Sequence, residues 1–169
     1  MRDHLVQMAG YNAWANRRLY AAVRALPDAA YRADRGAFFR SLHGTLNHLL
    51  GTDRIWMRRF TGAGDAPDRL DAILHEDLDG LERARIAEDA RILGYVGGLD
   101  AAALAGTIRY RRVTTPEPIE QPLGPGLAHL FNHQTHHRGQ AHAILTGLDR
   151  EAPALDLLFY QREAERGAA

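Results

Sequence analysis

The sequence contains no cysteine. Disulfide bonds, thiolate metal sites, iron–sulfur clusters, covalent haem attachment and a cysteine nucleophile are therefore all excluded. Any metal ion that this chain holds must be bound by nitrogen or oxygen atoms. The distribution of histidine and carboxylate residues is for this reason the most informative feature of the sequence.

The sequence also lacks a net charge and a long apolar run. Lysine plus arginine and aspartate plus glutamate both total 21, so the formal net charge is zero. This balance argues against a general affinity for nucleic acid or an anionic membrane. No apolar run is long enough to cross a bilayer, and residues 1–4 do not begin a signal peptide. We therefore expect a soluble, cytoplasmic protein that binds neither nucleic acid nor membrane. Two small arginine clusters are nevertheless present: Arg54, Arg58 and Arg59, and Arg109, Arg111 and Arg112.

The apolar residues indicate a helical protein. The 169 residues fit one domain over residues 1–169, and a hydrophobic fraction of 46% suffices for a core. Asp79 and Glu82 resemble a capping box, so we expect Asp79 to cap the third long helix. Apolar residues recur at helical spacing in four long segments and one short one: 3–26, 39–60, 79–98, 127–146 and 154–164.

A segment of a different period precedes the last long helix. Residues 107–113 alternate and are rich in β-forming side chains, and residues 119–123 could run back beside them after a turn. Two strands alone are marginally stable, so we expect them to lean on the helices. The fold class is therefore all-α, a four-helix bundle with a short fifth helix and a small β excursion before helix four.

Histidines concentrate in the last long helix. Five of the nine lie between residues 129 and 142. Because positions i and i+4 stack on one face of a helix, His129, His133 and His137 form one line. This line interrupts an otherwise apolar helix, and each buried polar group without a partner costs roughly 1–3 kcal/mol. A divalent transition metal would satisfy His133 and His137 together.

Other interpretations of these histidines stay open at this point. A single helical histidine is more often exposed or hydrogen-bonded in a core than bound to metal. His129 could be a third ligand, a supporting residue or a core residue, and His136 lies one residue off the line. The second long helix offers His43 and His48 as partners, and composition does not choose between them. The remaining histidines show no supporting pattern and are expected to be structural or exposed: His4, His75 and His142.

Several known metal motifs are missing. Gln134 stands where the general-base glutamate of His-Glu-x-x-His would be. No Glu-x-x-His pair exists, which argues against a ferritin-type di-iron site. Without an adjacent carboxylate base, hydrolysis would have to rely on a metal-bound water molecule.

Three segments together resemble the DinB/YfiT family of helical bundle proteins, which is unrelated to the DNA polymerase that shares the name. The resemblance covers nearly the whole chain, and the third segment is its most specific part. The segments are Tyr11-Asn12-Ala13-Trp14-Ala15-Asn16, Asn47-His48-Leu49-Leu50 with Asp53 and Trp56, and residues 132–140 with the sequence Asn-His-Gln-Thr-His-His-Arg-Gly-Gln.

The resemblance implies an up-down-down-up bundle that is often a homodimer. It also implies a three-histidine metal site, which corresponds here to His48, His133 and His137. The metal would be nickel or zinc, with iron, manganese or cobalt as further options, and water would complete the coordination shell. The wider superfamily carries out thiol-dependent transfer and isomerisation with low-molecular-weight thiols such as bacillithiol or mycothiol.

The resulting functional hypothesis is a metal-dependent thiol transferase. Because the chain lacks cysteine, the thiol must be a cosubstrate whose pKa the metal lowers. Arg138 could bind an anionic cosubstrate or could be a solvated surface charge. A metal-water-dependent hydrolase and a non-catalytic metal-binding stress protein are the alternatives. Four residues are candidates for orienting the ligand imidazoles: Asp53, Asn132, His136 and Gln140.

Overall fold

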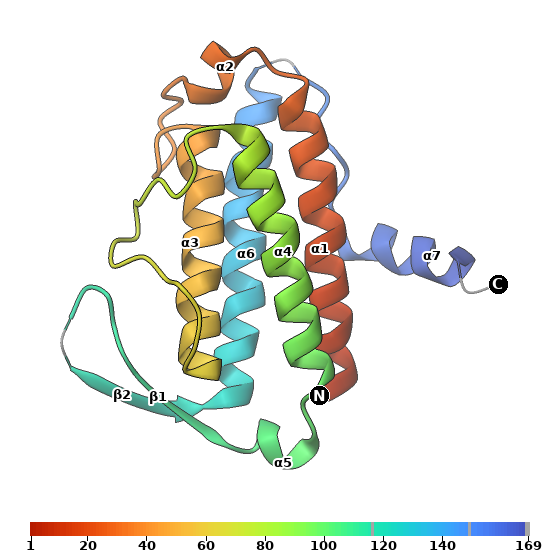
Figure 1. The fold of residues 1–169 in the computed structure, drawn as a ribbon. Helices are drawn as coiled ribbons and strands as arrows, with labels where there is room; N and C mark the ends of the chain where they lie inside the picture. The colour runs from red at the N-terminus through yellow and green to blue at the C-terminus, as the bar shows by residue number, and fades with distance from the viewer. Residues whose placement is uncertain (116, 149, 168–169) are drawn as a thin grey trace.

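Four long helices form a bundle in the computed structural model, which describes residues 1–115, 117–148 and 150–167 (Figure 1). α1 packs against α4 and α6, and α3 packs against the other sides of the same two helices. The bounds of the four are α1 Arg2–Arg24, α3 Leu42–Thr61, α4 Leu78–Gly97 and α6 Leu123–Thr146. The shorter helices are α2 Asp28–Arg32, α5 Ala101–Leu104 and α7 Leu157–Gly167.

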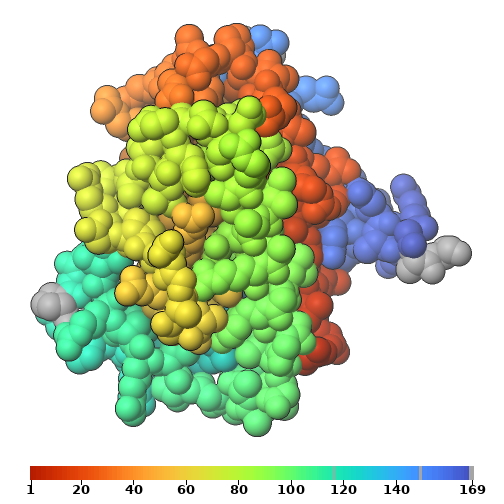
Figure 2. Space-filling model, viewed as in Figure 1, coloured from red at the N-terminus to blue at the C-terminus, as the bar shows by residue number. Residues whose placement is uncertain are grey.

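The chain direction confirms the up-down-down-up order. α1 and α6 run upward in Figure 1, and α3 and α4 run downward. Because α3 and α4 are parallel neighbours, the chain must return along the full length of α3 before α4 can begin. Residues 62–77 make this return, and in Figure 2 they cover much of α3 on the face shown. This crossover connection brings backbone groups to a helix face that a short loop would leave open.

Two apolar clusters occupy the two ends of the bundle, and a polar layer separates them. One cluster includes Leu5, Met57 and Leu127, and the other includes Leu19, Leu46 and Leu145. The polar layer lies between these positions on every long helix and is buried. It consists of Asn12 and Asn16 on α1, Asp53 on α3, Arg85, Glu88 and Asp89 on α4, and Gln134 and Arg138 on α6.

The helix boundaries differ from the sequence expectations at their N-terminal ends. α3 begins at Leu42, where the Ser41 side chain accepts a hydrogen bond from the backbone N–H of Gly44 at 3.0 Å. Asp77 caps α4 in the same way, through the N–H of Gly80. The expected cap, Asp79, is wrong, because Asp77 lies at the position from which a side chain reaches an unpaired N–H of the first turn.

The β excursion is a hairpin of β1, Thr107–Arg111, and β2, Pro118–Pro122, paired antiparallel with Ile108 opposite Gln121. As expected, it leans on the bundle. The Ile108 side chain is buried in one apolar cluster, and the Tyr110 ring lies 5.5 Å from the Trp56 ring of α3. Within the described residues, no helix has both the length and the apolar character that crossing a membrane requires.

Candidate metal centre

Three imidazoles from two antiparallel helices converge at one point. His48 comes from α3, and His133 and His137 come from successive turns of α6. The Nε2 atom of His48 lies 3.3 Å from Nε2 of His133 and 3.2 Å from Nε2 of His137. All three nitrogens lie within 4.8 Å of one another. This cluster could hold one metal ion.

The spacing of the nitrogens fits a common ion. Three nitrogens bound at about 2.0–2.1 Å in tetrahedral geometry lie roughly 3.3–3.4 Å apart. The two distances from Nε2 of His48 are close to this value, and the ligand atoms of His133 and His137 lie within 4.8 Å of each other. The cluster is therefore compact enough for one ion to contact all three imidazoles.

The hydrogen bonds of the other ring nitrogens supply an independent test of the fit. Nδ1 of His48 lies 2.7 Å from the carbonyl oxygen of Leu70, and Nδ1 of His137 lies 2.7 Å from Oε1 of Gln140. Both oxygens are acceptors, so a neutral ring in this position carries its proton on Nδ1 and has a bare lone pair on Nε2. Two bare lone pairs 3.2 Å apart repel each other unless a cation lies between them. The donor set therefore fits a metal ion.

Burial keeps these imidazoles neutral. Burial lowers the pKa of His48 to about 4 and is opposed by the hydrogen bond to Leu70. Burial and the neighbouring histidines lower the pKa of His133 to about 3, and burial also lowers the pKa of His137. Neutral imidazole is the form that binds metals. At neutral pH protons therefore do not compete for the cluster.

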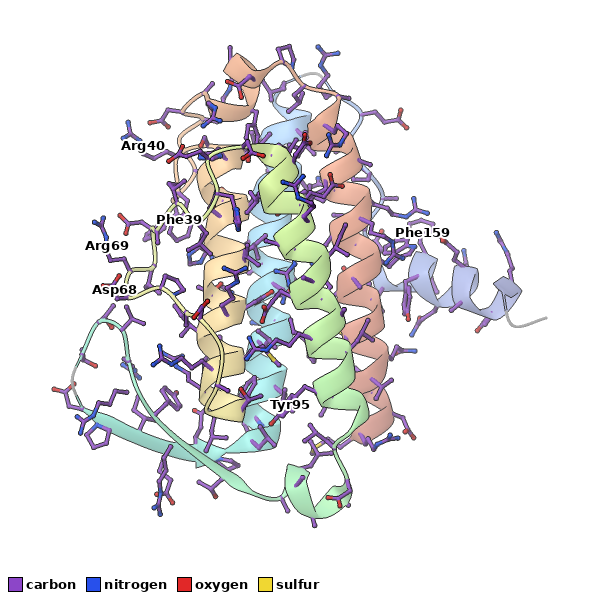
Figure 3. The ribbon with its side chains drawn as sticks, viewed as in Figure 1. Phe39, Arg40, Asp68, Arg69, Tyr95 and Phe159 are labelled. Atoms are coloured by element: carbon purple, nitrogen blue, oxygen red, sulfur yellow. The ribbon has the colours of Figure 1, made fainter. Side chains whose placement is uncertain are left out.

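Two features around the cluster were not visible in the sequence. The Phe39 ring stacks on the His48 ring, with centroids 3.6 Å apart and an angle of 19° between the planes. Phe39 is labelled beside α3 in Figure 3. Phe39 was expected to begin a helix, but it lies in the segment before α3. The Leu70 carbonyl comes from the crossover connection, and no residue type signals the position of a backbone acceptor.

The other residues expected near the metal lie at different distances from it. Gln140 contacts a ligand directly through Nδ1 of His137. His136 is exposed, and its Nε2 lies 3.3 Å from Nε2 of Gln140, while its ring lies edge-on to that of His137 with centroids 4.8 Å apart. Asn132 is exposed. His129 is also exposed, with its ring 4.9 Å from that of Trp56.

Two sequence expectations are corrected. Asp53 does not orient an imidazole: its carboxylate accepts hydrogen bonds from Arg85 and Gln134, both at 2.5 Å. The reason is its position five residues after His48, which places it about 140° around the helix. Arg138 is not a solvated surface charge. It is 2% exposed and donates to Gln134 and Asn12 in the polar layer.

Gln140 gives a test of the ligand geometry. Replacing Gln140 by alanine removes the acceptor that fixes the Nδ1–H of His137, so metal affinity is expected to fall by about 10–100-fold. The measurement is competition with a chromophoric chelator. Replacing His142, which lies on the same helix outside the cluster, should leave the affinity unchanged. An unchanged affinity in the Gln140→Ala protein would contradict an orienting role.

The fold and the cluster together define a class: a four-helix bundle of up-down-down-up order with a three-histidine cluster that could hold a metal ion. The sequence also assigns the chain to a family. The family model of the DinB family matches residues 1–168, and the chain belongs to this family.

Individual relatives agree with this assignment. Protein DinB from Bacillus subtilis (strain 168) is 26% identical over 153 residues, which cover 86% of each chain. YfiT from Bacillus subtilis, described as a probable metal-dependent hydrolase with an unusual four-helix bundle topology, matches with a TM-score of 0.63, 14% identity and 89% of each chain covered. A crystal structure of a DinB-like protein from Bacillus cereus ATCC 10987 gives a TM-score of 0.62 at 13% identity, covering 83% of this chain and 89% of that one.

Proposed function

We propose that this protein is a metal-dependent thiol transferase whose metal ion is held by His48, His133 and His137. The observation that carries the proposal is a cavity of about 450 Å³ that has His48 and His133 in its lining. Cavities of this size accept small organic molecules. A small molecule in the cavity can therefore reach a metal bound by the imidazoles.

The donor set also supports a particular kind of chemistry. Three neutral imidazoles leave the full charge of a divalent ion uncompensated, and nickel or zinc suits them best, with iron, manganese or cobalt as further options. A metal bound there would lower the pKa of a thiol or of a water molecule that joins its coordination shell. Leu70 and Gln140 hold the Nδ1 protons, and the Phe39 ring excludes water from one side of His48.

The absence of a carboxylate base favours a thiol as the nucleophile. No aspartate or glutamate lines the cavity within the described part of the chain, so no carboxylate there can remove a proton. A thiol needs less assistance than water, because its pKa is about 8.5, compared with 15.7 for water. The chain has no cysteine, so the thiol must be a low-molecular-weight cosubstrate.

A second function is favoured by one comparison. YfiT, which shares the fold, is described as a probable metal-dependent hydrolase. In that case water would replace the thiol at the same metal. A non-catalytic metal-binding stress protein is the remaining alternative.

Cobalt substitution separates these functions. Adding 2-mercaptoethanol to the Co(II) protein is expected to produce an intense sulfur-to-cobalt charge-transfer band, and adding ethanol should not. The protein should also transfer the thiol to 1-chloro-2,4-dinitrobenzene faster than the His137→Ala variant does. Hydrolysis of p-nitrophenyl acetate without a thiol effect would establish the second function. No spectral change and no turnover of either compound would favour the non-catalytic alternative.

Two further expectations belong with this proposal. A homodimer and a cytoplasmic location remain predictions from the sequence. The first can be measured by light scattering, and the second by fractionation of cells that contain the protein.

A further inference from the structure

The cavity beside the histidine cluster lies among α3, the first half of α6, the β hairpin and the crossover connection. His48 and His133 line one part of it. Trp56, Arg59 and Tyr110 line another part. A molecule in the cavity would therefore contact both the metal ligands and a cationic, aromatic surface.

The charges that line the cavity have one sign. Arg59 and Arg112 contribute guanidinium groups, and among the described lining residues there is no aspartate or glutamate. Arg112 is exposed and lies near Glu117, whose pKa it helps to lower. Arg59 is half-buried. Burial, together with the charge of Arg112, lowers the pKa of Arg59, so the protein makes this cation less favourable than it would be in water.

Arg59 differs from the other shielded arginines of the described residues. Four others are buried or half-buried, and each has an oxygen acceptor: Arg54 pairs with Glu88, Arg85 with Asp53, Arg91 with Glu88, and Arg138 with Asn12. The interactions of Arg59 are instead with two rings. Its guanidinium carbon lies 4.5 Å from the centroid of Trp56 and 4.3 Å from that of Tyr110. Contacts with ring faces do not use the N–H donors at the edge of a guanidinium group.

A carboxylate would supply the oxygen acceptors that the other shielded arginines have and Arg59 lacks. Two parallel N–H···O bonds from a guanidinium edge match a planar carboxylate, and such charged pairs are stronger than neutral ones. The two aromatic rings hold the Arg59 side chain in place, so little rotamer entropy is lost when an anion binds. Ile55 and Val113 add apolar surface beside the charged groups.

We propose that the cavity selects small molecules that carry a carboxylate, which Arg59 binds while the rest of the molecule extends toward the histidine cluster. The inference rests on the proposed function only in taking the cavity as the substrate site. It assigns a substrate class, which that proposal leaves open. This carboxylate anchor, the Arg59 guanidinium group held by two aromatic rings, belongs to the chain itself. It is expected to bind a carboxylate with or without a metal ion.

Tryptophan fluorescence can test the anchor directly. The chain has two tryptophans, so a Trp14→Phe protein reports on Trp56 alone. The probes are phenylacetate and phenylacetamide, which have nearly the same shape and differ in charge. Phenylacetate is expected to bind the Trp14→Phe protein about tenfold or more tightly than phenylacetamide, with zinc and without it.

Substitutions then show whether Arg59 is the residue that causes the preference for phenylacetate. Arg59→Gln in the Trp14→Phe background should abolish the preference for phenylacetate, and Arg59→Lys, which keeps the charge but not the planar fork, should retain a small part of it. Arg58→Gln is the matched control, because Arg58 is the exposed neighbour on the same helix and does not line this cavity. The control should keep the full preference.

Three results would overturn the inference: no saturable binding of phenylacetate, equal affinity for acid and amide, or an undiminished preference in Arg59→Gln. Circular dichroism and zinc content should match between Arg59→Gln and Arg58→Gln, which shows that both fold. This test can be separated from the test of the proposed function. If the protein prefers phenylacetate but transfers no thiol, the inference about Arg59 stands and the proposed function fails. If it transfers a thiol but does not prefer phenylacetate, the inference fails and the proposed function stands.

Discussion

Replacing His48 by alanine is expected to lower the affinity of the protein for its metal ion by at least about 100-fold. Loss of a residue that only orients a ligand costs about 10–100-fold, and loss of one ligand of three must cost at least as much. His48 is the one ligand that α3 supplies, and its Nε2 lies within 3.3 Å of both other nitrogens. The measurement is metal content by elemental analysis after dialysis of untagged protein.

The matched control is His43→Ala. His43 is buried on the same helix, but its Nδ1 lies 3.0 Å from the hydroxyl of Tyr31 and it is outside the cluster. Its removal should leave the metal content of the folded protein unchanged. Equal metal content in wild type and His48→Ala, or loss of metal in His43→Ala alone, would show that the wrong histidine of α3 has been assigned.

Replacing Arg85 by alanine is expected to lower the free energy of unfolding by about 3–5 kcal/mol, the cost of breaking a buried ion pair by removing one partner. Arg85 is 2% exposed, and it lies 2.5 Å from the Asp53 carboxylate and 3.0 Å from that of Asp89. Without the guanidinium group, both carboxylates would remain in the bundle interior with no positive charge from this residue. Burial raises the pKa of Asp53, whereas Arg85 opposes this rise. Urea unfolding measures the change.

Arg83→Ala is the control for this experiment. Arg83 is exposed on the same helix, so its removal should change the free energy of unfolding by no more than about 0.5 kcal/mol. A similar small effect for Arg85→Ala would mean that the carboxylates find other partners or become protonated at little cost.

Most of the fold could be predicted from the pattern of apolar residues in the sequence. The spacing of apolar residues located all four long helices, because a helix that packs on one side must repeat its apolar residues every three to four positions. The bundle order came from the family resemblance. The boundaries of α3, α4 and α6 were less accurate, because caps depend on which side chain reaches the first free N–H groups.

Some residues of the site could be predicted from the sequence, and others could not. His133 and His137 follow from the i, i+4 rule on one helix. Spacing could not decide between His43 and His48, since the choice depends on how α3 is rotated toward α6. The burial of Arg138 could have been inferred, because it lies four residues after Gln134 and three before Ala141, on the buried face of α6. The contact between the Leu70 carbonyl oxygen and His48 could not be predicted, because residue types do not indicate the path of the crossover connection.

The polar layer in the middle of the bundle also decides which histidines can meet. Helices that touch only through leucines can slip by one turn, about 5.4 Å, and exchange one leucine for another. A slip of α6 against α3 would take Gln134 away from Asp53 and leave buried polar groups unpaired. The same slip would change which imidazoles of α6 stand level with His48. The alignment of the helices, fixed by the polar layer, therefore selects the ligand set, and the chain is expected to present the same three nitrogens before a metal ion arrives.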